Sequence, residues 1–212
     1  MMWGMLVNRR RIRTRHGLPA PLLLACLALG AAAATAHAYT GGPVRATIEG
    51  FEPTENKLFY SLWFYDESDS APQVYYFLLT GDKLLESIRA RSLEPPEGQP
   101  WDGNLTVAWV NLRKRLVPLA ALPEFQLELR VRADSTGTIE RFRAARYQLH
   151  LSVLYGDRER TLDLEAFCEP LVRIRGVYGV PGRLEHLALL SIIGRPYGCE
   201  ETDIPLLLPA EP

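Results

Sequence analysis

The sequence predicts a mainly β fold, an antiparallel meander or sandwich-like domain with one or two short helices. Three observations favour it. Apolar and polar residues alternate with a period of two in several segments, which is typical of strands with one buried face. Gly-Asp and Pro-Gly pairs, which form tight turns, stand between these segments. Apolar residues at helical spacing are confined to short stretches.

The first 38 residues have the composition of a secretory signal peptide. Five arginines lie within residues 9–15, and the first 38 residues contain no acidic residue. An apolar run follows at 18–36 and ends in the small-x-small sequence Ala36-His37-Ala38. These three parts are those of an export signal, so we expect cleavage after Ala38 and a periplasmic or secreted location.

Two alternatives keep the domain on a membrane. The apolar run approaches the roughly 20 residues of a transmembrane span, so an uncleaved segment would act as an anchor. Leu23-Leu24-Ala25-Cys26 resembles the lipobox of bacterial lipoproteins, in which the cysteine is lipidated. We therefore expect contact with a membrane only if Cys26 is lipidated or the signal is uncleaved.

The charge expected for the mature chain argues against a general nucleic-acid binder. Cleavage after Ala38 removes five arginines, which leaves 19 basic residues against 25 acidic ones and a net charge of −6. Binding to nucleic acid needs net or clustered positive charge. The whole chain has three lysines against 21 arginines, a bias typical of a GC-rich bacterial genome.

Residues 39–212 are long enough for a single exported domain that buries about two-thirds of the surface of its unfolded chain. The Pro- and Gly-rich stretch 94–103 divides this domain into lobes at about 39–94 and 104–212.

The first lobe is the more apolar one. Residues 58–65 and 74–79 carry apolar side chains on both faces, which is typical of strands buried on both sides or placed at an interface. Residues 83–91 fit either a third strand or a helix.

The clearest helix is expected at 105–116. Asp102 is placed to cap its start, and Pro118 to end it. Its apolar residues recur at helical intervals: Leu105, Trp109, Leu112 and Leu116.

The second lobe contains the strongest strand signals. Residues 125–133 alternate without a break, which predicts a half-buried strand. Gly156-Asp157 predicts a type II′ turn that joins strands at 146–155 and 158–167 in an antiparallel hairpin.

The C-terminal part of this lobe continues the pattern, with strands expected at 172–175, 187–193 and 204–208. The sequence Val180-Pro181-Gly182-Arg183 fits a type II turn. Residues 194–203 are expected to form a loop.

One stretch resembles a known repeat. Ile48–Phe51, the acidic turn 66–69, the strand 74–77 and Thr80-Gly81-Asp82-Lys83 together resemble a single blade of the TolB-type β-propeller repeats. The resemblance covers about residues 46–91 and is shared with predicted secreted bacterial proteins of unknown function. It implies a β-meander and an exported location. It implies no functional residue, and the chain lacks the repetition that a propeller requires.

The sequence predicts no catalytic residue, no metal site and no cofactor. It contains neither a Gly-x-Ser-x-Gly elbow nor a Ser-x-x-Lys motif with its companions. His150 and His186 are the histidines that remain after cleavage, and both stand at positions expected to be polar surface. Cys168 and Cys199 lack zinc-ligand spacing, and in an oxidising compartment we expect them to form a disulfide.

Two kinds of candidate binding site remain. The first is an aromatic surface made of Trp63, Tyr65, Tyr75 and Tyr76. Such side chains stack on sugars or contact partners when they face outward, whereas in strands they commonly pair within the core.

The second is a cation site made of Asp66, Glu67 and Asp69, with Glu200, Glu201 and Asp203 as another acidic cluster. Calcium takes oxygen ligands from loops of this kind, but neither cluster has EF-hand spacing. A solvated turn is the alternative for both clusters.

The sequence therefore favours an exported, non-catalytic β-domain that binds an unknown partner protein or a cell-envelope component. The alternative is a periplasmic hydrolase with a carboxylate site that combines the acids at 66–69 with the C-terminal acids. Two carboxylates in one cleft would favour the enzyme, and acids spread over open loops would favour the binding domain.

The signal and the disulfide can be tested together by the intact mass of protein made with its own leader in a Gram-negative host. We expect a chain that starts at Tyr39 and whose Cys168 and Cys199 resist alkylation until they are reduced. An uncleaved chain, or one with a lipid on Cys26, would contradict release from the membrane. Two reactive thiols before reduction would contradict the disulfide.

Overall fold

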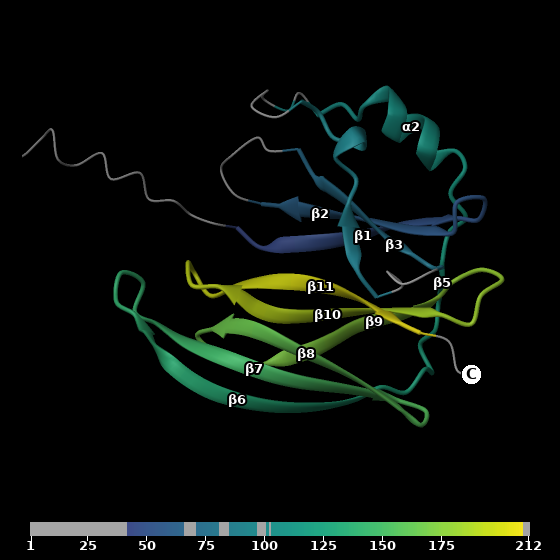
Figure 1. Cartoon of the computed structure of the whole chain (residues 1–212). Helices are drawn as coiled ribbons and strands as arrows, with labels where there is room; N and C mark the ends of the chain where they lie inside the picture. Colours follow the sequence, from purple (N-terminus) through teal and green to yellow (C-terminus); the bar gives the residue numbers. More distant parts are fainter. Residues whose placement is uncertain (1–41, 66–70, 81–84, 97–100, 102, 210–212) are drawn as a thin grey trace, which may run out of the picture. The chain divides into compact units, whose positions relative to one another are not determined.

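The computed structural model describes residues 42–65, 71–80, 85–96, 101 and 103–209, and it has the mainly β fold that the sequence predicts (Figure 1). The strands are β1 (Val44–Glu52), β2 (Lys57–Phe64), β3 (Gln73–Leu78), β4 (Ser87–Arg89), β5 (Ala120–Ala121), β6 (Glu128–Ile139), β7 (Ala144–Tyr155), β8 (Arg158–Phe167), β9 (Val172–Gly179), β10 (His186–Arg195) and β11 (Glu200–Leu208). The helices are the 3-10 helix η1 (Arg91–Leu93) and α2 (Val107–Arg113).

The strands form two sheets. Eight strands follow the order β4-β3-β2-β1-β11-β10-β9-β5, and three follow the order β6-β7-β8. Neighbouring strands are antiparallel except β1 and β11, which are parallel and share the register pair Val44↔Thr202. The eight-stranded sheet thus takes strands from both sides of the Pro- and Gly-rich stretch 94–103.

Strands β2 and β3 are buried on both faces, as the sequence predicts. On one face of β2, Phe59 lies in an apolar cluster with Trp109 of α2. On the other face, Leu58 lies in a cluster with Leu187 of β10 and Leu207 of β11. The first half of the eight-stranded sheet, β1–β4, therefore packs through this second cluster on the second half, which contains β5 and β9–β11.

Strands β10 and β11 are also buried on both faces. Leu187 and Leu207 face the first half of the sheet, whereas Leu190 and Leu206 lie in a cluster with Leu151 of β7. Strands β9–β11 therefore form a middle layer, with β1–β3 on one side and β6–β8 on the other (Figure 1).

Helix α2 is shorter than the helix expected at 105–116. Thr106 caps it, because its Oγ1 accepts a hydrogen bond from the Trp109 N–H at 3.2 Å and donates one to the Leu93 carbonyl at 2.7 Å. The expected cap, Asp102, lies outside the described residues. All four apolar residues that were expected on one helix face pack in the cluster under α2.

Both predicted turns are confirmed. Strands β7 and β8 pair in the expected hairpin, and Gly156 in its turn has a φ of 54°. In the second turn the Arg183 N–H donates to the Val180 carbonyl at 3.1 Å, and Gly182 has a φ of 69°. Glycine adopts such angles without a steric penalty, so local chemistry determines both turns.

Two of the predicted segments differ in extent. The strand expected at 125–133 begins at Glu128 and continues to Ile139 as β6, and Val131, which was expected on a half-buried face, is 40% exposed. The loop expected at 194–203 is wrong, because β10 continues to Arg195 and β11 begins at Glu200. Glu201 and Asp203 pair with arginines of β1 and β9, so these polar residues belong to a strand although their composition resembles that of a loop.

The disulfide Cys168–Cys199 is confirmed, with a Cα–Cα distance of 5.9 Å. It joins the end of β8 to the turn between β10 and β11, so it ties the three-stranded sheet to the middle layer. A cross-link that closes a loop of 31 residues stabilises a fold by about 3–4 kcal/mol in the chain-entropy model.

Candidate functional site

The four aromatic residues of the expected binding surface do not share one face. The ring of Tyr75 stacks on that of Tyr60 with centroids 5.5 Å apart, in the cluster that faces β10 and β11. The ring of Tyr76 packs against Phe59 at 5.5 Å, in the cluster under α2. Successive residues of a strand point to opposite faces, which accounts for the separation.

Trp63 and Tyr65 lie at the end of β2. The Trp63 Nε1–H donates to Ser61 Oγ at 3.0 Å, and its ring meets that of Trp101 edge to face at 5.5 Å. Tyr65 follows the strand and is 58% exposed. The aromatic residues of the first lobe thus pack mainly within the fold, and Tyr65 is the most exposed of the four.

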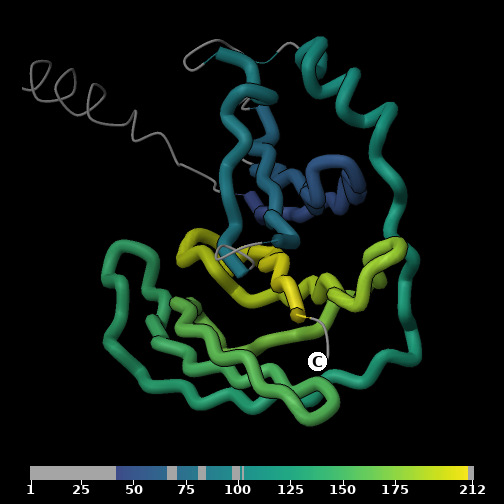
Figure 2. The backbone as a smooth tube through the Cα atoms, turned by 45° about the vertical axis from the view of Figure 1, so that its right-hand side comes forward, coloured from purple at the N-terminus to yellow at the C-terminus, as the bar shows by residue number. Residues whose placement is uncertain are grey.

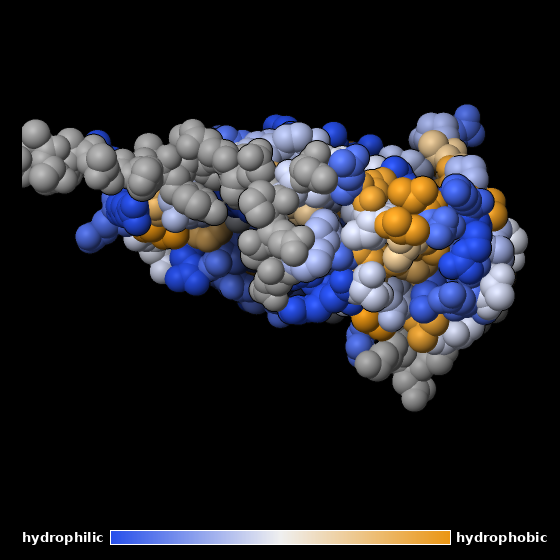
Figure 3. All heavy atoms as spheres, turned by 90° about the horizontal axis from the view of Figure 1, so that it is seen from above, coloured by the Kyte–Doolittle hydropathy of each residue, from blue (hydrophilic) through white to orange (hydrophobic). Residues whose placement is uncertain are grey.

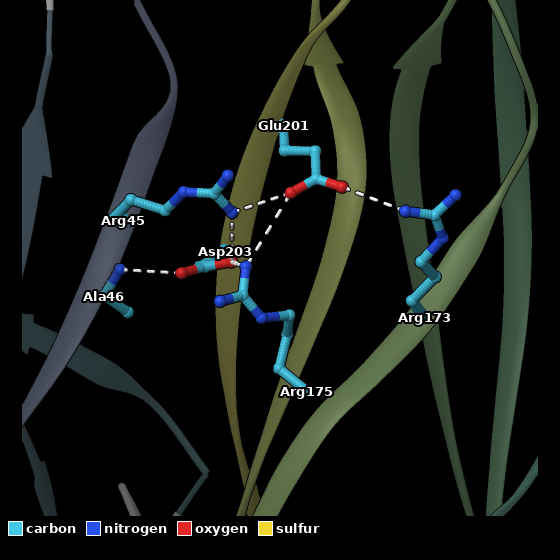
Figure 4. A network of polar contacts seen from close by, with 6 residues as sticks. All are labelled: Arg45, Ala46, Arg173, Arg175, Glu201 and Asp203. Carbon is cyan, nitrogen blue, oxygen red and sulfur yellow. Dashed lines mark hydrogen bonds and ion pairs between the residues drawn. The ribbon is translucent and has the colours of Figure 1, made fainter.

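The first acidic cluster, Asp66, Glu67 and Asp69, lies outside the described residues. In the second cluster, Glu201 and Asp203 meet Arg45 of β1 at the junction between β1 and β11 (Figure 4). One guanidinium nitrogen of Arg45 lies 2.7 Å from Glu201 Oε2 and 3.5 Å from Asp203 Oδ1.

Two arginines of β9 bind the same carboxylates from the other side (Figure 4). Arg173 Nη1 donates to Glu201 Oε1 at 3.1 Å. Arg175 Nη1 lies 3.4 Å from Asp203 Oδ1 and 3.7 Å from Glu201 Oε2. Asp203 is 4% exposed, and its second oxygen accepts the Ala46 N–H at 3.0 Å. The Asp203 carboxylate therefore accepts a hydrogen bond from β1 in the position where a backbone carbonyl of a neighbouring strand would normally accept it.

The electrostatics of this junction favour a structural role for the two carboxylates over a role in acid–base catalysis. The hydrogen bond from Arg45 lowers the pKa of Glu201 below its ordinary value, and the charges of Arg173 and Arg175 act in the same direction. A general acid needs a raised pKa so that it holds a proton near neutral pH. Three guanidinium groups around two carboxylates have the opposite effect on Glu201.

Two other buried carboxylates are also held by arginines. Glu49 accepts hydrogen bonds from Ser61 Oγ at 2.6 Å and from Arg113 Nε at 2.8 Å, and Glu52 lies 3.6 Å from Arg115 Nη1. Within the described parts of the chain, no three His, Cys, Asp or Glu side chains are grouped to hold a metal ion.

Of the two histidines in the described residues, one lies on the surface and the other packs against an aromatic ring. His150 lies on the outer face of the three-stranded sheet, with Nδ1 2.6 Å from Asp163 Oδ1 and Nε2 3.3 Å from Asp134 Oδ2. The ring of His186 packs against that of Phe125, with centroids 4.6 Å apart.

One feature, an uncovered side of the sandwich, was not predicted from the sequence. Among the described residues, β6 pairs with β7 alone. The outer edge of β9 is paired, within the same residues, only near its C-terminal end. There it pairs with β5, and the Val177 carbonyl accepts a hydrogen bond from the Leu122 N–H at 2.8 Å. From Leu122 the chain crosses to β6. Figure 2 shows this connection, which runs from α2 past β9. At the other edge of the three-stranded sheet, the Arg160 guanidinium of β8 donates to the Leu207 carbonyl of β11, so the free edges of β6 and β9 lie on the same side.

Apolar side chains are exposed on this side. Leu129 of β6 and Val172 of β9 pack against the core between the sheets. Val131 and Ile174 follow two residues later on the same faces, and they are 40% and 41% exposed. We call residues 128–135 of β6 and 172–176 of β9 the open side. The alternation at 125–133 predicts a strand, but it cannot show that the apolar face of the strand is left uncovered.

A shallow hollow of about 360 Å³ lies over β6 and β7 and includes residues of the open side. It is lined by Arg130, Val131, Arg132, His150 and Ser152.

A second exposed apolar patch lies on α2 (Figure 3). Val107 and Val110 are 78% and 40% exposed on the face of the helix that points away from the sheet. This patch belongs to a seven-residue helix whose basic neighbours Arg113 and Arg115 bind Glu49 and Glu52. Its exposed side chains belong to a helix, so the patch itself offers no strand backbone for pairing.

Comparison of the chain with family models, with curated proteins and with solved structures gave no match. The described segments contain no helix long and apolar enough to cross a membrane.

The junction predicts a pH-dependent effect of Glu201→Gln. Because the pKa of Glu201 is lowered in the fold, its charged form stabilises the protein above the ordinary pKa of a glutamate, and this contribution is lost as the pH falls through the lower folded value. We expect the substitution to reduce the free energy of unfolding at pH 7 by roughly 1 kcal/mol. The reduction should shrink as the pH falls from 7 to 2, because the carboxyl becomes protonated in the folded protein as well as in the unfolded protein.

Urea unfolding at both pH values measures this effect. Glu200→Gln is the matched control, because Glu200 is the neighbouring acid on β11 and is not among the ion-paired residues of the junction. An equal loss of stability for Glu201→Gln at pH 7 and at low pH would contradict an ionic role for Glu201.

Proposed function

We propose that the protein is an exported, non-catalytic β-domain that binds a partner protein or a cell-envelope component. The observation that supports this most is the open side, where unpaired strand edges and exposed apolar side chains occur together. Isolated exposed apolar residues are common on protein surfaces and carry little information. An unpaired edge with apolar side chains beside it is a template for another strand.

The lengths of the sheet edges support this choice. The eight-stranded sheet ends in β4 with three residues and β5 with two, and such short edges offer few backbone groups for pairing. Strand β6 has 12 residues, and the irregularity in its pairing with β7 falls between Ser135 and Gly137. Residues 128–135 thus offer a regular, unpaired edge of useful length.

The disulfide supports an extracytoplasmic location, because disulfides persist in oxidising compartments and are rare in the cytoplasm. The leader at 1–38, on which the export proposal also depends, lies outside the described residues.

The hydrolase alternative has less support. It needs two carboxylates that share a cleft and have different pKa values. Glu201 and Asp203 do lie together, but arginines on both sides hold them as an ionic junction. Its other proposed acids, at 66–69, lie outside the described residues.

Site-specific photo-cross-linking in the producing cell tests the binding proposal. A benzophenone amino acid at position 131 should give a covalent adduct with a partner, because this side chain lies beside the unpaired edge. Position 161, on the outward face of β8, is the control, since Thr161 is exposed and lies on the opposite edge strand. Adducts at both positions in equal yield, or none at position 131, would contradict a binding role for the open side.

A further inference from the structure

The outward-facing charges of the unpaired β6 segment form a symmetric pattern. Glu128, Arg130, Arg132 and Asp134 occupy alternate positions in the order acid, base, base, acid. Their side chains are 62%, 65%, 73% and 54% exposed. The intervening inward positions include Leu129 and Val131.

Strand β7 does not complement these charges. The residues opposite Glu128, Arg130 and Asp134 are the uncharged Leu154, Ser152 and Gln148, and His150 stands opposite Arg132. Opposite charges directly across a pair of strands stabilise the pairing, so this contribution is absent on the β7 side. It remains available to a strand on the other edge.

The charges now pair along their own strand. Arg130 Nε lies 2.8 Å from Glu128 Oε1, and Arg132 Nη2 lies 3.2 Å from Asp134 Oδ2. Asp134 is also 3.3 Å from His150 Nε2. Ion pairs this exposed contribute little, and a partner can replace them at small cost.

A second copy of the chain fits this edge poorly. Antiparallel pairing of residues 128–134 with the same residues of another copy, centred on Val131, would place Arg130 opposite Arg132 and Glu128 opposite Asp134. Like charges opposite one another destabilise strand pairing. Registers centred on Ala133 or on Leu129 would bring opposite charges together, but the first runs into the irregularity between Ser135 and Gly137, and the second sets Arg132 and Asp134 opposite residues that precede β6.

We propose that the open side binds an extended segment of another protein with the outward pattern base, acid, acid, base at alternate positions and apolar or β-branched residues between them. The segment adds to β6 as a fourth strand, which places its acids opposite Arg130 and Arg132. Its inward side chains cover Val131. Because the β6 pattern is symmetric, parallel and antiparallel segments both satisfy it. This inference rests on the proposed binding function and specifies its partner.

Two capped peptides of identical composition test the pattern. Lys-Thr-Glu-Val-Glu-Thr-Lys carries the complementary order, and Glu-Thr-Lys-Val-Lys-Thr-Glu carries the inverse order. In fluorescence anisotropy at low salt, we expect the first to bind the mature protein about tenfold more tightly, because four cross-strand charge pairs change sign between the two peptides. The preference should shrink in 0.5 M salt, since exposed charges are screened.

The matched variant inverts the pattern on the protein: Glu128→Lys, Arg130→Glu, Arg132→Glu and Asp134→Lys together. It keeps the net charge and the charge pairs along the strand, so we expect an unchanged unfolding midpoint and a reversed peptide preference. Equal binding of both peptides, binding of neither, or a β6-mediated dimer in sedimentation would overturn the inference. The adduct at position 131 tests the proposed function separately, since it requires a partner there but no particular charge pattern.

Discussion

The apolar character of both faces of β10 and β11 is the constraint on which the rest of the structure depends. Leu187 and Leu207 need cover on one face, and Leu190 and Leu206 need it on the other. Full burial of each leucine contributes about 1.5–3 kcal/mol. The first half of the large sheet covers one face, and the three-stranded sheet covers the other.

Both the junction and the open side follow from this arrangement. In the strand pairing of the described residues, the first half of the sheet is joined to the middle layer through β1 and β11, and Asp203 accepts a hydrogen bond from the Ala46 N–H there. The three-stranded sheet is tied down along β8, where the Arg160 guanidinium donates to the Leu207 carbonyl and Cys168 is bonded to Cys199. Strand β6 is two strands away from these ties, and within the part of the chain that the structure describes its edge and part of its apolar face stay uncovered.

The sequence predicted what local chemistry determines. The period of two located the strands, glycine located the turns at Gly156 and Gly182, and the expectation of an oxidising compartment predicted the Cys168–Cys199 pair. Features that depend on contacts between residues far apart in the sequence were not predictable. Glu201 and Asp203 made their segment resemble a loop, because the arginines that pair with them lie on β1 and β9. The aromatic residues of β2 and β3 divide between two faces that only the tertiary structure defines. The exposure of Val131 depends on which strand faces it, and no local pattern contains that information.

The most direct test of the central claim, that the edge of β6 is unpaired, is amide hydrogen exchange followed residue by residue by NMR. In an antiparallel edge strand only alternate residues bond to the neighbouring strand. Over residues 128–135 we therefore expect slow and fast amides in alternation, with the fast ones near the rate of an unstructured peptide. The amides of β7, which is paired on both edges, should all be slow and serve as the internal control. Uniform protection across residues 128–135 would show that another segment or another molecule already covers this edge, and it would contradict the account.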